Sequence, residues 1–123
     1  MTTSIKQDGI DALNILQTRL SRWQKKNFKE EDCAAEWMIA GAVEEIGEAA
    51  HIILKARQKI RKYQAGFDEV AREDLKDAVG DAVIYLMQLC SQTGIMFGGA
   101  VFDTADGVLE RNWKDKKKDG VNE

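Results

Sequence analysis

Helical periodicity is the feature that most restricts the fold of this chain. The sequence of 123 residues contains no proline, and apolar residues recur at spacings of three or four positions along most of its length. No stretch of alternating apolar and polar residues is convincing as a β-strand. The sequence therefore predicts an all-α fold, in which each helix buries an apolar face.

Short breaks that contain glycine or asparagine divide this pattern into four expected helices. The helices are expected at about residues 5–26, 31–63, 69–93 and 98–113. Asp68 is a suitable N-cap for the third helix, and Gly94 is a suitable end for it. At this length the chain forms about one domain. We assign residues 1–113 to a single helical domain and residues 114–123 to a polar C-terminal tail.

Charge and cysteine content restrict the partners. Lys and Arg total 18 against 21 Asp and Glu, a net charge of −3, whereas a general nucleic-acid binder is strongly basic. Cys33 and Cys90 stand far apart without a CxxC pair, which indicates neither a zinc site nor a disulfide framework. No apolar stretch is long enough for a membrane span or a signal peptide. We expect a cytoplasmic protein without nucleic-acid or membrane partners.

Acidic residues interrupt two otherwise apolar helical segments. Between residues 38 and 54 the only ionisable residues are Glu44, Glu45, Glu48 and His51. At roughly 100° per residue, Glu44, Glu48 and His51 share one sector of a helix, and Glu45 lies at its edge. Three carboxylates therefore converge on one stripe.

The second such segment spans residues 78–90, where Asp81 is the only charged residue and Asp77 lies one turn before it on the same face. Buried carboxylates are costly unless they are protonated, paired or bound to a cation. Hard oxygen ligands suit Mg²⁺ or Mn²⁺ and leave room for a phosphate-bearing substrate. Cations for the outer phosphates would come from the end of the second helix, at Lys55, Arg57, Lys59, Arg61 and Lys62.

Each of these features also has a purely structural explanation. An EExxE string is usually a solvated helical face, and the basic run fits a solvated helix end equally well. His51 is more often a core residue than a ligand, and tryptophans are more often core or interface residues than stacking platforms. Glycines inside the helices, at Gly41, Gly47 and Gly80, suit a close backbone approach around the site or close packing alone.

In their order, the two acidic segments resemble the signature of the MazG-like, all-α nucleoside triphosphate pyrophosphatases, which is EExxE followed by ExxD. Residues 44–48 read EEIGE and residues 77–86 read DAVGDAVIYL. The similarity covers about residues 20–113 and includes Trp23, Gln24, Asn27, Phe28, His51, Lys55, Gln58, Ile60, Arg61, Arg111, Asn112 and Trp113. One position departs from the signature, because Ala78 replaces the usual glutamate. Asp77 lies on the same face and is its expected substitute.

The resemblance implies a four-helix MazG-like bundle, completed by oligomerisation into a homodimer or homotetramer. It implies Mg²⁺-dependent conversion of a nucleoside triphosphate into the monophosphate and pyrophosphate, with a purine nucleotide such as dGTP as one candidate substrate. The catalytic carboxylates would be Glu44, Glu45, Glu48 and Asp81, with Glu45, Glu48, Asp77 and Asp81 as metal ligands and Glu44 as a further ligand or the group that orients the attacking water. Lys55 and Arg61 would contact the phosphates, and Trp23, Asn27, Phe28 and Trp37 would form the base pocket.

Two rival interpretations remain open at this point. In the first, the chain is a non-enzymatic helical oligomer whose acids form inter-subunit salt bridges with the cations of residues 55–62. It predicts no release of pyrophosphate. In the second, the chain is a metal-dependent hydrolase of another class or a di-iron carboxylate protein. The di-iron proteins require an ExxH pair from each of two helices, and His51, the single histidine, can complete only one such pair, with Glu48.

Overall fold

In the computed structural model, the described part of the chain is residues 3–116. Its elements are α1 (Thr3–Asn27), the 3₁₀ turn η1 (Glu30–Cys33), α2 (Ala35–Gln58), the 3₁₀ turn η2 (Arg61–Tyr63), α3 (Glu69–Thr93), α4 (Phe97–Leu109) and α5 (Trp113–Lys116). No strand occurs within residues 3–116, and the all-α prediction is confirmed. Over the same residues, none of the helices combines the length and apolar character that a membrane span requires.

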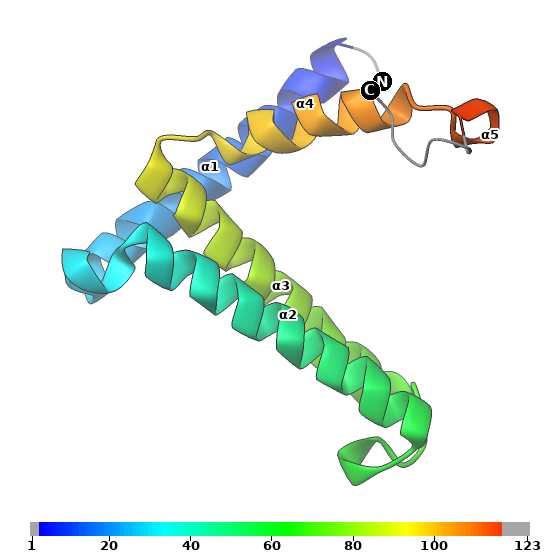
Figure 1. Cartoon of the computed structure of the whole chain (residues 1–123). Coiled ribbons are helices and arrows are strands. Elements are labelled where there is room, and N and C mark those ends of the chain that lie inside the picture. Colours follow the sequence, from blue (N-terminus) through cyan, green and yellow to red (C-terminus); the bar gives the residue numbers. More distant parts are fainter. Residues whose placement is uncertain (1–2, 117–123) are drawn as a thin grey trace.

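The helices are arranged as two arms of a V (Figure 1). One arm is a long hairpin in which α2 packs along α3. In the other arm α1 lies beside α4, and α1 also contacts α3 where the arms meet. The junction therefore brings the C-terminal part of α1 close to the hairpin.

The predicted third helix has the expected ends. The Asp68 side chain caps α3 by accepting a hydrogen bond from the backbone N–H of Ala71 at 3.1 Å. At the other end Gly94 adopts a left-handed conformation with φ of 74°, which glycine adopts without the steric cost of a Cβ. The first helix, α1, also agrees with its prediction to within two residues.

The prediction of a single second helix at residues 31–63 is wrong. Ala34 is extended, with ψ of 155°, and separates η1 from α2. Lys59 and Arg61 adopt left-handed conformations, with φ of 57° and 59°, so that α2 ends at Gln58. Beyond this point the chain turns back and buries Tyr63 between α2 and α3. Burial of one aromatic ring thus overrides the helical pattern.

The fourth helix is also shorter than predicted. It ends at Leu109, and Trp113 begins the separate one-turn helix α5. The predicted polar tail overlaps α5 at residues 114–116, and its remaining residues, 117–123, lie outside the described residues.

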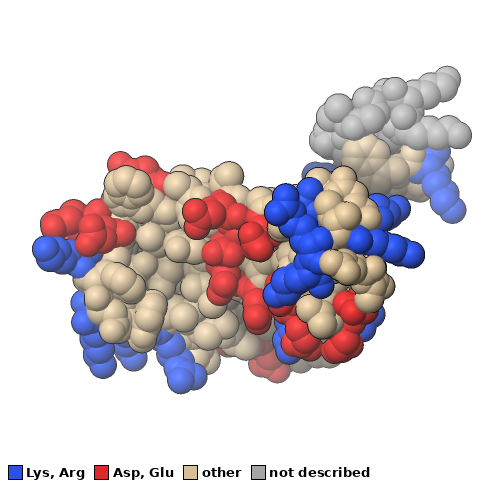
Figure 2. Space-filling view, turned by 90° about the horizontal axis from the view of Figure 1, so that it is seen from below, with Lys and Arg blue, Asp and Glu red and all other residues tan. Residues whose placement is uncertain are grey.

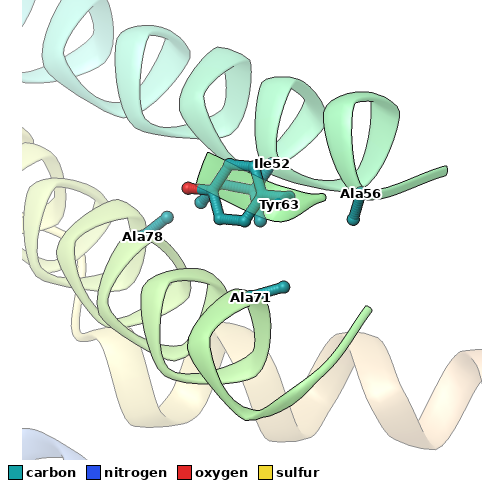
Figure 3. Packing of buried hydrophobic residues seen from close by; sticks show 5 residues of the cluster. All are labelled: Ile52, Ala56, Tyr63, Ala71 and Ala78. Carbon is teal, nitrogen blue, oxygen red and sulfur yellow. The ribbon is translucent and has the colours of Figure 1, made fainter. Parts of the chain in front are cut away.

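The core of the hairpin consists mostly of small side chains. Ile52, Ala56, Tyr63, Ala71 and Ala78 are all buried between α2 and α3 (Figure 3). Because alanine adds little bulk, the two helices can approach closely along their length. This packing holds the acidic residues of the two helices on a common side of the hairpin.

The start of α4 is fixed by side chains from α1. The backbone N–H of Phe97 donates to Gln17 Oε1 at 2.8 Å, and that of Gly98 donates to Asn14 Oδ1 at 2.8 Å. Both N–H groups belong to the first turn of α4, where no partner exists within the helix. Gln17 also donates to the Ile95 carbonyl at 2.9 Å, which ties the α3–α4 turn to α1.

Candidate functional site

A pocket on the hairpin gathers most of the residues of the predicted site. We call it the acidic pocket; it is lined by Glu45, Glu48, His51, Ile52, Arg61, Lys62, Tyr63, Asp74, Asp77, Ala78 and Asp81. The predicted metal ligands thus line one pocket from two helices. On the face of the molecule seen in Figure 2, acidic side chains adjoin a group of basic ones.

The carboxylates are less buried than the apolar sequence around them predicted. Of the carboxylates predicted for the site, Glu44, Glu48, Asp77 and Asp81 are exposed, and Glu45 is half-buried. The prediction of buried acids is wrong for the single chain, because over residues 3–116 α2 and α3 pack mainly against each other and the remaining helices contact them chiefly at the junction. Neighbouring apolar side chains are exposed for the same reason.

Glu45 carries the clearest electrostatic signal. Its pKa is raised above 4.5, first by partial burial and then by repulsion from Asp81, Glu44 and Glu48. Protonation or a nearby cation would relieve this repulsion. The carboxylates of α2 and α3 therefore interact with one another as a group, as a cation-binding site requires.

The donor set fits Mg²⁺ by chemistry, although its side chains are not gathered as a closed cage. Within residues 3–116, no group of three or more Asp, Glu, His or Cys side chains is close enough to hold a metal ion unaided. Mg²⁺ is commonly held by one or two carboxylates together with water and substrate phosphates. An open carboxylate pocket satisfies that requirement.

The far end of the acidic pocket is basic. Arg61 lines it and begins η2 in a left-handed conformation. Lys62 Nζ lies 2.7 Å from Asp74 Oδ2, and the Tyr63 hydroxyl donates to the same oxygen at 2.8 Å. These contacts, that of Lys62 foremost, hold the pKa of Asp74 below 3.8. Lys55, the other predicted phosphate contact, lies outside this lining, and its Nζ donates to Gln58 Oε1 at 3.3 Å.

A second pocket adjoins the first at the junction of the arms. We call it the aromatic pocket; it is lined by Leu20, Trp23, Gln24, Phe28, Asp32, Cys33, Met38, Glu45, Asp81, Ile84, Tyr85 and Gln88. The rings of Trp23 and Phe28 meet edge to face, with centroids 5.6 Å apart. Glu45 and Asp81 line both pockets, so that the carboxylates stand between them.

Two of the four residues predicted to bind the base lie outside the aromatic pocket. Asn27 is exposed, and its side-chain amide donates to the Trp23 carbonyl at 2.8 Å. Trp37 is 60% exposed at the start of α2 and lines a separate hollow. The structure brings together only Trp23 and Phe28 from that set.

No role in the base pocket was predicted from the sequence for Gln24, Tyr85 and Gln88, three uncharged polar residues that line the aromatic pocket. A signal for Gln88 was present, because it interrupts an apolar segment much as Asp81 does. Tyr85 accounts for Gly41, where an added Cβ would lie 2.3 Å from the Tyr85 ring.

The other two glycines singled out in the sequence behave differently. At Gly47 and Gly80 an added Cβ would meet nothing within 4 Å. The expected close approach is therefore absent at both positions in the single chain, within the described residues. These glycines lie on open surface.

Comparisons of the chain with protein-family models, with curated proteins and with solved structures found no match. The resemblance to MazG-like pyrophosphatases therefore stays a prediction from motifs.

Proposed function

We propose that the chain is a Mg²⁺-dependent nucleotide pyrophosphohydrolase that converts a nucleoside triphosphate into the monophosphate and pyrophosphate. The observation that supports this most directly is that Glu45 and Asp81 line both pockets. Aromatic rings, carboxylates and Arg61 thus follow one another along a continuous surface. A nucleotide has matching parts in the same order: a flat base, the α-phosphate, and the outer phosphates.

The position of each residue in the two pockets suggests its role in the proposed reaction. Trp23 and Phe28 would stack on the base, and Arg61 would contact the outer phosphates, joined by Lys55 if its side chain turns from Gln58. The metal would be held by Glu45, Glu48, Asp77 and Asp81, with Glu44 as a further ligand or the group that orients water. The chemistry expected of bound Mg²⁺ is neutralisation of phosphate charge and activation of the attacking water. No covalent nucleophile is needed.

We further propose that a second copy covers the open side of the hairpin and completes a four-helix bundle, in a homodimer or homotetramer. Apolar side chains beside the acids support this: Val43 is 62% exposed, Ile46 55% and Val79 53%. Contiguous exposed apolar surface marks interaction sites. Light scattering at micromolar concentration should give a multiple of the 13.8 kDa chain mass. A monomer mass would contradict this part of the proposal.

The activity is tested by incubating the protein with canonical ribo- and deoxyribonucleoside triphosphates and Mg²⁺. We expect monophosphate and pyrophosphate in equal amounts, with no turnover in EDTA. Glu73→Gln is a suitable control, because Glu73 is an exposed acid of α3 outside both pockets, and this variant should keep full activity. A diphosphate and orthophosphate as first products would contradict cleavage at the α-phosphate, and no products at all would favour the non-enzymatic oligomer.

A further inference from the structure

The aromatic pocket contains a hydrogen-bond acceptor without a partner. Gln88 lines this pocket on α3 and is 2% exposed. Its Oε1 is the only buried side-chain nitrogen or oxygen within the described residues that makes no hydrogen bond. Buried polar atoms are nearly always paired, so one that is unpaired beside a pocket requires a partner from outside the chain.

The orientation of the Gln88 amide determines what such a ligand must bring. Gln88 Nε2 donates to the Leu20 carbonyl of α1 at 2.9 Å. That contact fixes the amide nitrogen toward α1 and leaves the oxygen as the free end. Because an amide oxygen only accepts hydrogen bonds, its partner must be a donor.

The surroundings of Gln88 indicate which class of molecule provides the donor. Trp23 and Phe28 provide aromatic surface in the same pocket, and aromatic side chains stack on flat rings. Glu45 and Asp81, at the border with the acidic pocket, separate Gln88 from Arg61. A ring with N–H groups on its edge and phosphates beyond it matches all three features.

We propose that Gln88 selects the base of the substrate by accepting a hydrogen bond from an N–H group on the base edge. This inference rests on the proposed function, because it takes the ligand of the pocket to be a nucleotide. A base that lacks the donor leaves Gln88 Oε1 buried and unpaired, and binds more weakly for that reason. Gln88 is thus a specificity-determining residue rather than a catalytic one.

The test measures binding, which keeps it separate from hydrolysis. Calorimetry with α,β-methylene nucleotides and Mg²⁺ would compare each natural base with an analogue that lacks one edge donor. Suitable pairs are adenine with purine, guanine with hypoxanthine and with N1-methylguanine, cytosine with pyrimidin-2-one, and uracil with N3-methyluracil. For the preferred base, loss of the donor should weaken binding to the wild type by about tenfold or more. Gln88→Met should bind both members of that pair to within about twofold.

A second buried glutamine provides a matched control. Gln17 is 4% exposed, and both ends of its amide are paired, with Ile95, Ser91 and Phe97. Gln17→Met should melt at a lower temperature than the wild type but keep the full discrimination between analogues. Gln88→Met removes an unpaired atom, and we expect it to lose less stability than Gln17→Met.

A measurement on the wild type covers the case in which Gln88→Met does not fold. The ¹⁵N resonance of the Gln88 side-chain amide should shift on addition of the donor-bearing nucleotide and remain in place with its analogue. Equal binding of both members of every pair, or discrimination that survives in Gln88→Met, would overturn the inference and leave the hydrolase proposal standing. Discrimination without pyrophosphate release would support the inference and overturn the activity. Failure of all nucleotides to bind would overturn both.

Discussion

The two arms of the molecule hold their helices together by different chemistry. In the α1–α4 arm, Gln17 and Asn14 satisfy the first N–H groups of α4, so that polar groups are paired within the chain. In the hairpin arm the core is apolar and thin, while Glu45 and Asp81 repel one another at its surface. The first arm gains stability from its own contacts. In the second arm, the repulsion among the carboxylates would decrease if a cation bound. Such unrelieved repulsion is typical of a functional surface.

Substitution of Asp81 should produce the largest effect and tests the hairpin side of this comparison. Asp81→Asn keeps the side-chain shape but removes one repelling charge from the pocket. We expect a loss of pyrophosphate release greater than the roughly 100-fold that outer-shell changes cost at metal sites. Without metal, the variant should melt no lower than the wild type.

Addition of Mg²⁺ should increase the difference in stability between the wild type and Asp81→Asn. By mass action it should stabilise the wild type by about 2.7 kcal/mol at roughly a hundred times its dissociation constant, and stabilise Asp81→Asn much less. The salt-bridge interpretation requires the opposite sign, because breaking a buried pair costs about 3–5 kcal/mol. Thermal melts of both proteins, with and without Mg²⁺, measure this difference. A metal-free variant far less stable than the wild type would refute the cation site.

Substitutions at two adjacent glycines, Gly98 and Gly99, test how closely the helices of the α1–α4 arm pack. At Gly98 an added Cβ would lie 2.4 Å from the Ile10 carbonyl oxygen, which belongs to the backbone of α1 and cannot turn away. Gly98→Ala should therefore lower the free energy of unfolding by about 1–3 kcal/mol. At Gly99 nothing lies within 4 Å, and Gly99→Ala should raise it by about 0.5–1 kcal/mol. Urea titrations measure both; equal effects would show that α1 and α4 do not approach so closely.

Substitution of Asp74, which lies near the far end of the hairpin, should give the smallest effect. Its folded pKa lies below its unfolded value of 3.8 because of Lys62 and Tyr63. Its contribution to stability is thus present above pH 3.8 and is lost as the pH falls through the folded pKa. Between about pH 5 and about pH 3, the melting temperature of Asp74→Asn should fall less than that of the wild type. Tyr63→Phe should change the slope in the same direction by less, and parallel curves would exclude the pairing.

The elements that the sequence predicted well are those with local signals. Asp68 and Gly94 delimit α3 because a capping side chain and a left-handed glycine act within one turn of the helix. The end of α2 has no such signal. Lys59 and Arg61 are not typical left-handed residues, and they adopt that conformation where the chain turns to bury Tyr63 against α3. A long-range contact therefore decides a boundary that local patterns place several residues later.

The residues of the candidate site were likewise predicted only where the signal was local. Helical spacing was sufficient to place Glu45 and Glu48 on one stripe and Asp77 with Asp81 on another, and the structure joins the stripes in one pocket. The roles of the buried glutamines were not predicted, because an uncharged amide inside a helix does not indicate its partners even where, as at Gln88, it interrupts an apolar segment. Gln88 meets Leu20 of α1, 68 residues away, which only the tertiary structure reveals.

The side-chain caps of α4 also bear on how the molecule opens. The amide hydrogens of Phe97 and Gly98 are bound by residues 80 and 84 positions earlier in the chain. Fraying of α4 alone leaves the acceptors in place, whereas separation of α1 from α4 removes them. Exchange of these two hydrogens with solvent deuterium therefore reports how often the start of α4 separates from its acceptors on α1.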